Sequence, residues 1–327
     1  MDICLVEDLD TLQQFQAVEE ASLAHHFVGL PADPIEERVP LLDGRARAGA
    51  LTRLYVATLD DGTPVGSLTL VFPTLDNLIV ANVDGAVAPG HLRQGYGRQL
   101  FEHAIELVRA EGRTRVFVEA PWLPDGGEGP AFGFLKEAGA RAVLDDYRRI
   151  VDLRTHPVGP VHPVPDGYRV EQWVDVAPEA LVDGCAYLMG RMMLDAPKGE
   201  MDYDQEKWDA ARYREKEQDA QDRGRVRVAT AVVHEETGQV AGITDIGVNK
   251  LRTEVAYQWD TIVDPDHRGH RLGMVLKTYN HQFLEKTVAE VHWINTWNAA
   301  SNSFMVAVND ALGFQIAEKW SEWQLDL

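Results

Sequence analysis

The chain has 327 residues, 45% hydrophobic and 25% charged, a composition typical of an ordinary globular protein with enough apolar side chains for two cores. Its net charge of −21 argues against nucleic acid as a partner, because an acidic surface repels phosphates. The acidity either aids solubility alone or also favours cationic small molecules. No apolar run reaches the roughly 20 residues of a membrane helix. The two cysteines, Cys4 and Cys185, form no CxxC pair and the first residues lack a signal peptide, so we expect a cytoplasmic protein.

The first half of the chain alternates strands and helices. Strands are predicted at 3–6, 54–59, 65–72, 78–87, 116–118 and 143–153, and helices at 12–23, after 97 and up to 139. Residues 155–167 contain four prolines in thirteen residues, which can continue neither a helix nor a central strand. We therefore predict a linker at 155–167 between an N-terminal domain, 1–154, and a C-terminal domain, 168–327.

The second half follows a similar order. Strands are predicted at 168–173, 225–234, 240–248, 254–263 and 292–296, and helices up to about 223, at 274–288 and at 302–312. The highly charged segment 204–223 is most simply a solvated helix face. The fold class expected is α/β (α+β): two tandem domains, each a mixed, mostly antiparallel sheet flanked by helices.

One segment of the first half recurs 176 positions later in the second. Residues 87–97 and 263–273 both have the pattern Val-x-Pro-x-His-x5-Gly. The same separation relates Gly62 to Gly238, Gly66 to Gly242 and Asp84 to Asp260. This periodicity indicates a duplicated domain.

In both copies a strand enters a polar, glycine-containing loop and a helix follows at once. Unpaired backbone N–H groups and the helix dipole make such a helix start an anion site, and glycine lets a pyrophosphate approach the backbone. A dinucleotide fingerprint would need a third glycine where Leu100 stands, and no Gly-Lys-Ser/Thr of a P-loop occurs. His267 and His270 lie in the loop with no evident third ligand, so no metal site is expected.

These loops resemble the pyrophosphate motif of the GNAT acetyltransferases, Val-x-Pro-x-x-Arg/Gln-x-x-Gly-x-Gly/Ala. Arg268 and Gly273 match it in the second copy, where Arg271 replaces the first glycine. Gly95 and Gly97 match it in the first, where Leu92 replaces the basic residue and Arg93 stands beside it. By this resemblance the residues expected to bind coenzyme are Val87, Arg93, Gln94, Gly95, Tyr96, Gly97, Arg98, Ile262, Val263, Arg268, Gly269, His270, Arg271, Leu272, Gly273 and Asn302.

A later motif of the family, Asn-x-x-Ala-x-x-Leu-Tyr-x3-Gly-Phe, is similar to residues 302–314, where Asn309 replaces the tyrosine that returns a proton to the coenzyme thiolate. Leu135 replaces it in the first copy and cannot donate a proton. Three alternatives remain: water protonates the thiolate, another side chain replaces the tyrosine, or one copy is inactive. By resemblance, the backbone N–H of Ile262 or Val263 would polarise the thioester carbonyl.

Acyl transfer to an alkyl amine needs a group that removes a proton from the amine. Asp84 and Asp260 lie three residues before the valine of each loop, inside apolar strands, and are the candidate bases. Glu254 and Glu119 are weaker candidates, and Asn309 is a candidate donor near the thiolate.

We expect an acetyl-CoA-dependent N-acetyltransferase that acts on a small-molecule amine, without metal, as a monomer or homodimer. The second half is expected to hold the better site, because it keeps Arg268, Asp260 and Asn302. A catalytically inactive acyl-CoA-binding protein is the alternative, and an acyltransferase for longer acyl chains is a second one.

Overall fold

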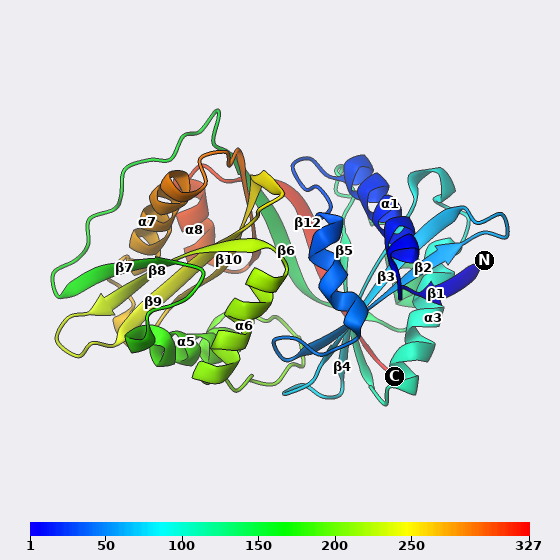
Figure 1. Cartoon of the computed structure of the whole chain (residues 1–327), viewed down its shortest axis with the longest axis horizontal. Coiled ribbons are helices and arrows are strands. Elements are labelled where there is room, and N and C mark those ends of the chain that lie inside the picture. Colours follow the sequence, from blue (N-terminus) through cyan, green and yellow to red (C-terminus); the bar gives the residue numbers. More distant parts are fainter. The chain divides into compact units, whose positions relative to one another are not determined.

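The computed structural model describes residues 1–327 except for the side chain of Met193, and it divides into two compact units (Figure 1). Unit 1 comprises Met1–Asp146, Lys198–Asp204 and Glu318–Leu327, and unit 2 comprises Tyr147–Pro197 and Gln205–Ala317. Two of these boundaries fall inside strands, β6 (Arg141–Asp152) and β12 (Gln315–Asp326). The compact units are therefore not the contiguous segments predicted from the sequence, although residues 153–167 do lack helix and strand.

Unit 1 is a mixed sheet with the strand order β1-β2-β3-β4-β5-β12. All its pairs are antiparallel except β4 with β5, which is parallel. Its further elements are β1 (Asp2–Leu5), α1 (Leu9–His26), α2 (Ile35–Arg38), β2 (Ala50–Thr58), β3 (Pro64–Pro73), β4 (Val80–Val87), α3 (Tyr96–Ala110), β5 (Arg115–Pro121) and α4 (Phe132–Glu137).

Unit 2 repeats this architecture with the strand order β7-β8-β9-β10-β11-β6. The pair β10 with β11 is again parallel, and the pairs among β7 to β10 are antiparallel. Its further elements are β7 (Tyr168–Val174), α5 (Val182–Asp195), α6 (Ala210–Asp222), β8 (Arg225–His234), β9 (Val240–Asn249), β10 (Arg252–Val263), α7 (Leu272–Thr287), β11 (Trp293–Ala299) and α8 (Ser303–Ala311). The sixth strand of each sheet comes from the other half of the chain. Most of β12, the last strand of the chain, belongs to unit 1, and the end of β6 belongs to unit 2.

The repeated glycines have repeated packing roles. A Cβ on Gly66 would lie 2.6 Å from Leu100 of α3, and one on Gly242 would lie 2.9 Å from Leu276 of α7. Both distances are shorter than packed carbon atoms allow, so glycine is what lets each helix approach its sheet. Both helix residues are again 176 positions apart, which explains in physical terms why this pair of glycines recurs.

Helices cover both faces of each sheet. In unit 1, Gly66 faces α3 while its neighbour Ser67 contacts Glu19 of α1, and adjacent strand residues point to opposite faces. In unit 2, α7 lies on one side of strands β8 to β10, and α5 and α6 lie on the other (Figure 1). None of the helices that the structure describes is long and apolar enough to cross a membrane.

Candidate functional site

The parallel strand pair ends within one residue of the equivalent position in both units. In unit 1 the pairing of β4 with β5 ends at Val83↔Val118, although both strands continue to Val87 and Pro121. In unit 2 the pairing of β10 with β11 ends at Gln258↔Thr296. Beyond these pairs the backbone of β4 and β10 is not bonded to the parallel neighbour, so its polar groups on that side need another partner, which a ligand can provide.

Strand alternation shows which backbone donors face the diverging strands. The N–H of Ala88 donates to the carbonyl of Val65, and that of Asp264 donates to the carbonyl of Ala241, both at 2.9 Å. Because successive residues of an antiparallel strand direct their N–H groups to opposite sides, Val87 and Val263 point theirs away from β3 and β9. Of the two donors expected in the second copy, Val263 is therefore correctly oriented and Ile262 directs its N–H toward β9.

Both loops adopt the same backbone conformation. Arg93 and Gly95 have φ of 61° and 87°, and Gly269 and Arg271 have φ of 87° and 58°. Arg93 is equivalent to Gly269, and Gly95 is equivalent to Arg271. Each copy therefore has one glycine and one arginine in the left-handed region, but in the opposite order. Arg271, which departs from the family motif, thus preserves the loop at a conformational cost of about 1 kcal/mol.

The helices that follow begin with unsatisfied donors. Neither Gly95 nor Arg271 provides a side-chain cap to α3 or α7, so backbone N–H groups of the first turn remain directed outward. A Cβ on Gly97 would lie 3.6 Å from Val87, an ordinary packing distance, so the fold itself does not require glycine there. These features fit a bound pyrophosphate, which needs donors and close approach to the backbone.

The other predicted coenzyme residues differ in their surroundings. Leu272 is buried in the core, so only its backbone is available, and Asn302 caps α8 by accepting from the N–H of Met305 at 3.2 Å. Arg268 lies 3.6 Å from Asp195, and Arg98 forms an ion pair with Glu137. The solvent-exposed members are Arg93, Gln94, Gly95, Arg98, Arg268, Gly269, His270 and Arg271, and Tyr96, Gly97 and Gly273 are half-buried.

Unit 1 gathers carboxyl groups at the point where β4 and β5 diverge. Asp84 is the first residue of β4 after the paired segment, and Glu119 is the first of β5. Glu322 of β12 lies directly opposite Glu119, and the two side chains share a hydrogen bond. Asp146 of β6 and Glu19 of α1 complete this group, which we call the acidic cluster.

Burial and mutual repulsion make these groups hard to ionise. Burial first, and neighbouring carboxylates second, raise the pKa of Glu19 and of Glu119 to about 7 and that of Glu322 to about 9. Burial and then Asp145 raise the pKa of Asp146 to about 6. Asp84 and Glu119 are accessible to solvent, yet the surrounding protein still removes enough water to raise the pKa of both.

Few groups offset this charge. Arg38 lies 3.6 Å from Glu19, and the hydroxyl of Ser67 donates to Glu19 at 2.5 Å. Sequence reasoning found Asp84 and Glu119 but missed Glu19, Asp146 and Glu322. Their segments are distant in sequence, and no local pattern shows that the exchanged strand β12 brings Glu322 beside Glu119.

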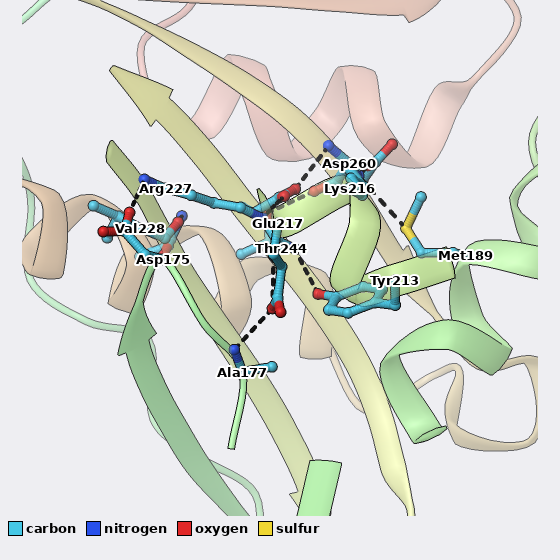
Figure 2. A network of polar contacts seen from close by, with 12 residues as sticks. Asp175, Ala177, Met189, Tyr213, Lys216, Glu217, Arg227, Val228, Thr244 and Asp260 are labelled. Carbon is cyan, nitrogen blue, oxygen red and sulfur yellow. Dashed lines mark hydrogen bonds and ion pairs between the residues drawn. The ribbon is translucent and has the colours of Figure 1, made fainter. Parts of the chain in front are cut away.

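In unit 2 the residue equivalent to Asp84 is neutralised. The Nζ of Lys216 lies 2.5 Å from Oδ2 of Asp260 (Figure 2). The lysine comes from α6, the helix expected to be a solvated face, which instead buries Arg212, Tyr213 and Glu217. The interpretation of the charged segment was therefore wrong for one side of the helix, and Asp260 is not free to take a proton from an outside amine, because its carboxylate is already paired with Lys216.

Two further catalytic candidates do not fit their predicted roles. Asn309 is buried, and its amide accepts from Lys277 at 2.7 Å and donates to Asn298 at 3.0 Å, so both ends are engaged. Burial lowers the pKa of Lys277 to about 7. Glu254 is exposed near the start of β10, roughly 20 Å along the strand from Asp260 at about 3.3 Å per residue, and lies outside the site.

Comparisons with known proteins agree with this geometry. The model of the acetyltransferase (GNAT) family matches residues 17–121, which run from α1 to β5 of unit 1. A tandem GNAT protein from the clavulanic acid biosynthesis pathway is 28% identical, with 99% of this chain and 98% of that chain covered and a TM-score of 0.82. The comparison with curated proteins found no match.

More distant structures share the fold. A GCN5-related N-acetyltransferase from Sphaerobacter thermophilus is 14% identical, with 99% of this chain and 95% of that chain covered and a TM-score of 0.69. A GCN5-related glucosamine N-acetyltransferase region of a fungal multi-domain enzyme is 13% identical, with 99% and 38% covered and a TM-score of 0.67. The GNAT family model thus matches one stretch of unit 1, and over nearly its whole length the chain is similar to a tandem GNAT protein, with the loop and the diverging parallel strands present in both units.

Proposed function

We propose that unit 1 transfers an acetyl group from acetyl-CoA to the amine of a cationic small molecule. The observation that carries this proposal is the acidic cluster, which begins at the residues where β4 and β5 diverge. The position of the family match, on unit 1 alone, supports the same choice. It reverses the expectation that the second half holds the better site, because Asp260 is paired with Lys216.

Backbone groups of unit 1 would hold the coenzyme. The first-turn N–H groups of α3 and the loop at Arg93 to Gly95 suit its pyrophosphate, and the N–H of Val87 suits the thioester oxygen. Acetyl-CoA supplies an activated acyl carbon. The protein supplies the orientation of that carbon and the removal of a proton from the acceptor.

Proton removal is the demanding step. An alkyl amine with a pKa near 10.4 must lose a proton at a cost of about 4.6 kcal/mol at pH 7, at about 1.36 kcal/mol per pKa unit. Asp84, directly or through water, is the proposed base, with Glu119 beside it. A carboxyl pKa near 7, as in Glu119, is matched to this task. Asp146, whose pKa of about 6 leaves it ionised at pH 7, attracts the acceptor cation.

The thiolate leaves without the family's tyrosine. Leu135 stands at that position, fully buried in the core of unit 1, and offers no proton. A thiol pKa near 8.5 makes the thiolate a tolerable leaving group, so it takes its proton from water or from a protonated carboxyl of the acidic cluster.

Thiol release with acetyl-CoA and a panel of amines tests the proposal. The panel should contain diamines, monoamines and aromatic amines that are uncharged at neutral pH. We expect turnover that favours the multiply charged acceptors and weakens with added salt, since exposed charge attraction is screened. Tight acetyl-CoA binding without turnover of any amine would support the inactive acyl-CoA-binding protein instead.

A further inference from the structure

The amine of Lys216 lies beside Asp260, the residue of unit 2 that is equivalent to the proposed base Asp84. The Nζ of Lys216 lies 2.5 Å from Oδ2 of Asp260 and 4.0 Å from the sulfur of Met189 (Figure 2). It also lies 6.0 Å from the ring centre of Trp208. The lysine side chain is only 22% exposed. Its position is therefore fixed by these contacts, unlike that of a mobile surface lysine.

Its position corresponds to that of an acceptor amine in unit 1. Asp260 is the equivalent of Asp84 and lies just past the last residue pair of β10 with β11. It comes three residues before Val263, whose N–H points away from β9. The loop at Gly269 and Arg271 keeps the backbone conformation of the first copy. A coenzyme bound in unit 2 as proposed for unit 1 would thus meet the amine of Lys216 beside a carboxylate.

A buried ionic network fixes the helix that carries this amine. Glu217, the next residue of α6, accepts from the N–H of Ala177 at 2.8 Å and pairs with Arg227 at 3.2 Å. Tyr213, one turn earlier, accepts from Arg227 at 2.5 Å (Figure 2). Arg227 also pairs with Asp245 at 2.6 Å. Because these groups are buried, α6 has little freedom to withdraw Lys216 from Asp260.

We propose that unit 2 acetylates its own Lys216. The ammonium of Lys216 first loses one proton through Asp260 to solvent. The bond from the neutral Nζ to the acetyl carbon then forms as the thioester C–S bond breaks, and the second amine proton passes through Asp260 to the released thiolate, so that the products are N-acetyl-Lys216, free coenzyme A and one proton in solvent. The positive charge of Lys216 is lost, which leaves Asp260 unpaired. This inference rests on the coenzyme geometry of the proposed function but does not depend on the base of unit 1.

Mass spectrometry of the intact chain after incubation with acetyl-CoA tests the proposal. Acetylation of Lys216 is compared with that of Lys250 and Lys286, two exposed lysines of unit 2, and a parallel sample receives acetyl phosphate as a chemical donor. An ion-paired, largely buried amine is a poor target for chemical acylation. We expect Lys216 to be modified at least tenfold faster than the controls by acetyl-CoA and more slowly than the controls by acetyl phosphate.

Variants separate this reaction from that of unit 1. Asp260→Asn keeps the shape of the side chain and should lower the modification of Lys216 at least tenfold, whereas Asp84→Asn should leave it unchanged. The rate per molecule should not depend on protein concentration. Modification of Lys216 no faster than that of Lys250, no effect of Asp260→Asn, or a rate that grows with protein concentration would each overturn the proposal. Lys216 acetylation without turnover of any free amine would refute only the function proposed for unit 1.

Discussion

Replacing Glu19 by Gln should change how the stability of unit 1 depends on pH. Burial and the neighbouring Asp84 raise the pKa of Glu19 from about 4.5 to about 7, and its side chain is 12% exposed. At a pH between about 4.5 and about 7, Glu19 therefore keeps its proton in the folded state and has lost it in the unfolded state. The stability from this proton is fully present below about pH 4.5 and is lost as pH rises through 7.

The size of the effect follows from the same pKa values. A shift of about 2.5 units corresponds to about 3 kcal/mol at about 1.36 kcal/mol per unit. A glutamine has no proton to lose and can still accept from the hydroxyl of Ser67. Glu19→Gln and the wild type should thus be similar at pH 5, and the variant should be more stable by up to about 3 kcal/mol at pH 8.5.

Urea unfolding followed by hydrogen exchange of peptides from β3 would measure this for unit 1. Glu20→Gln is the matched control, because Glu20 is the next residue of α1 and is exposed. Parallel pH profiles for the wild type and Glu19→Gln would refute the reasoning, since they would mean that Glu19 ionises in the folded protein at its ordinary pKa.

Three further predictions concern the loops and the network of unit 2. Gly97→Ala should weaken acetyl-CoA binding to unit 1 about tenfold in calorimetry, because the added Cβ keeps the pyrophosphate from approaching the backbone closely. The melting temperature should not fall, because that Cβ would meet Val87 at an ordinary packing distance of 3.6 Å and alanine favours a helix. A lower melting temperature would contradict this. Arg227→Met should destabilise unit 2 by about 3 to 5 kcal/mol in urea unfolding, because Asp245 and Glu217 would stay buried without their cation; a neutral effect would show that the network relaxes. Arg271→Gly should stabilise unit 2 by about 1 kcal/mol in the same assay by relieving the left-handed arginine; no gain would mean that the loop stores no strain there.

Repeated local patterns allowed much of the fold to be predicted. The separation of 176 residues carries both the turn glycines and the pairs in which Gly66 and Gly242 admit a leucine from the following helix. The loops were predictable for the same reason, since their chemistry lies in consecutive residues. Arg271 was interpreted as a departure from the motif, but only backbone angles reveal that it exchanges places with a glycine of the other copy.

Long-range arrangement limited the prediction of the site. Glu322 reaches the acidic cluster because β12 completes the sheet of unit 1. The periodicity of the sequence does not predict this exchange of strands. Asp260 does lie on a strand, β10, as predicted, but that place alone was the basis for choosing it as a base. The amine of Lys216 that cancels its charge comes from 44 residues away, on a helix whose composition favours solvent.

The central claim, that unit 1 catalyses through its acidic cluster, is tested most directly by one pair of variants. Thiol release with acetyl-CoA and the best amine of the panel should be measured for Asp84→Asn and Asp260→Asn, with coenzyme affinity measured alongside. We predict that Asp84→Asn lowers kcat at least about 100-fold, the lower end of the range for general acid–base catalysis, with little change in affinity, and that Asp260→Asn keeps turnover of the free amine. Loss of turnover in Asp260→Asn, with Asp84→Asn still active, would contradict the account and return catalysis to unit 2.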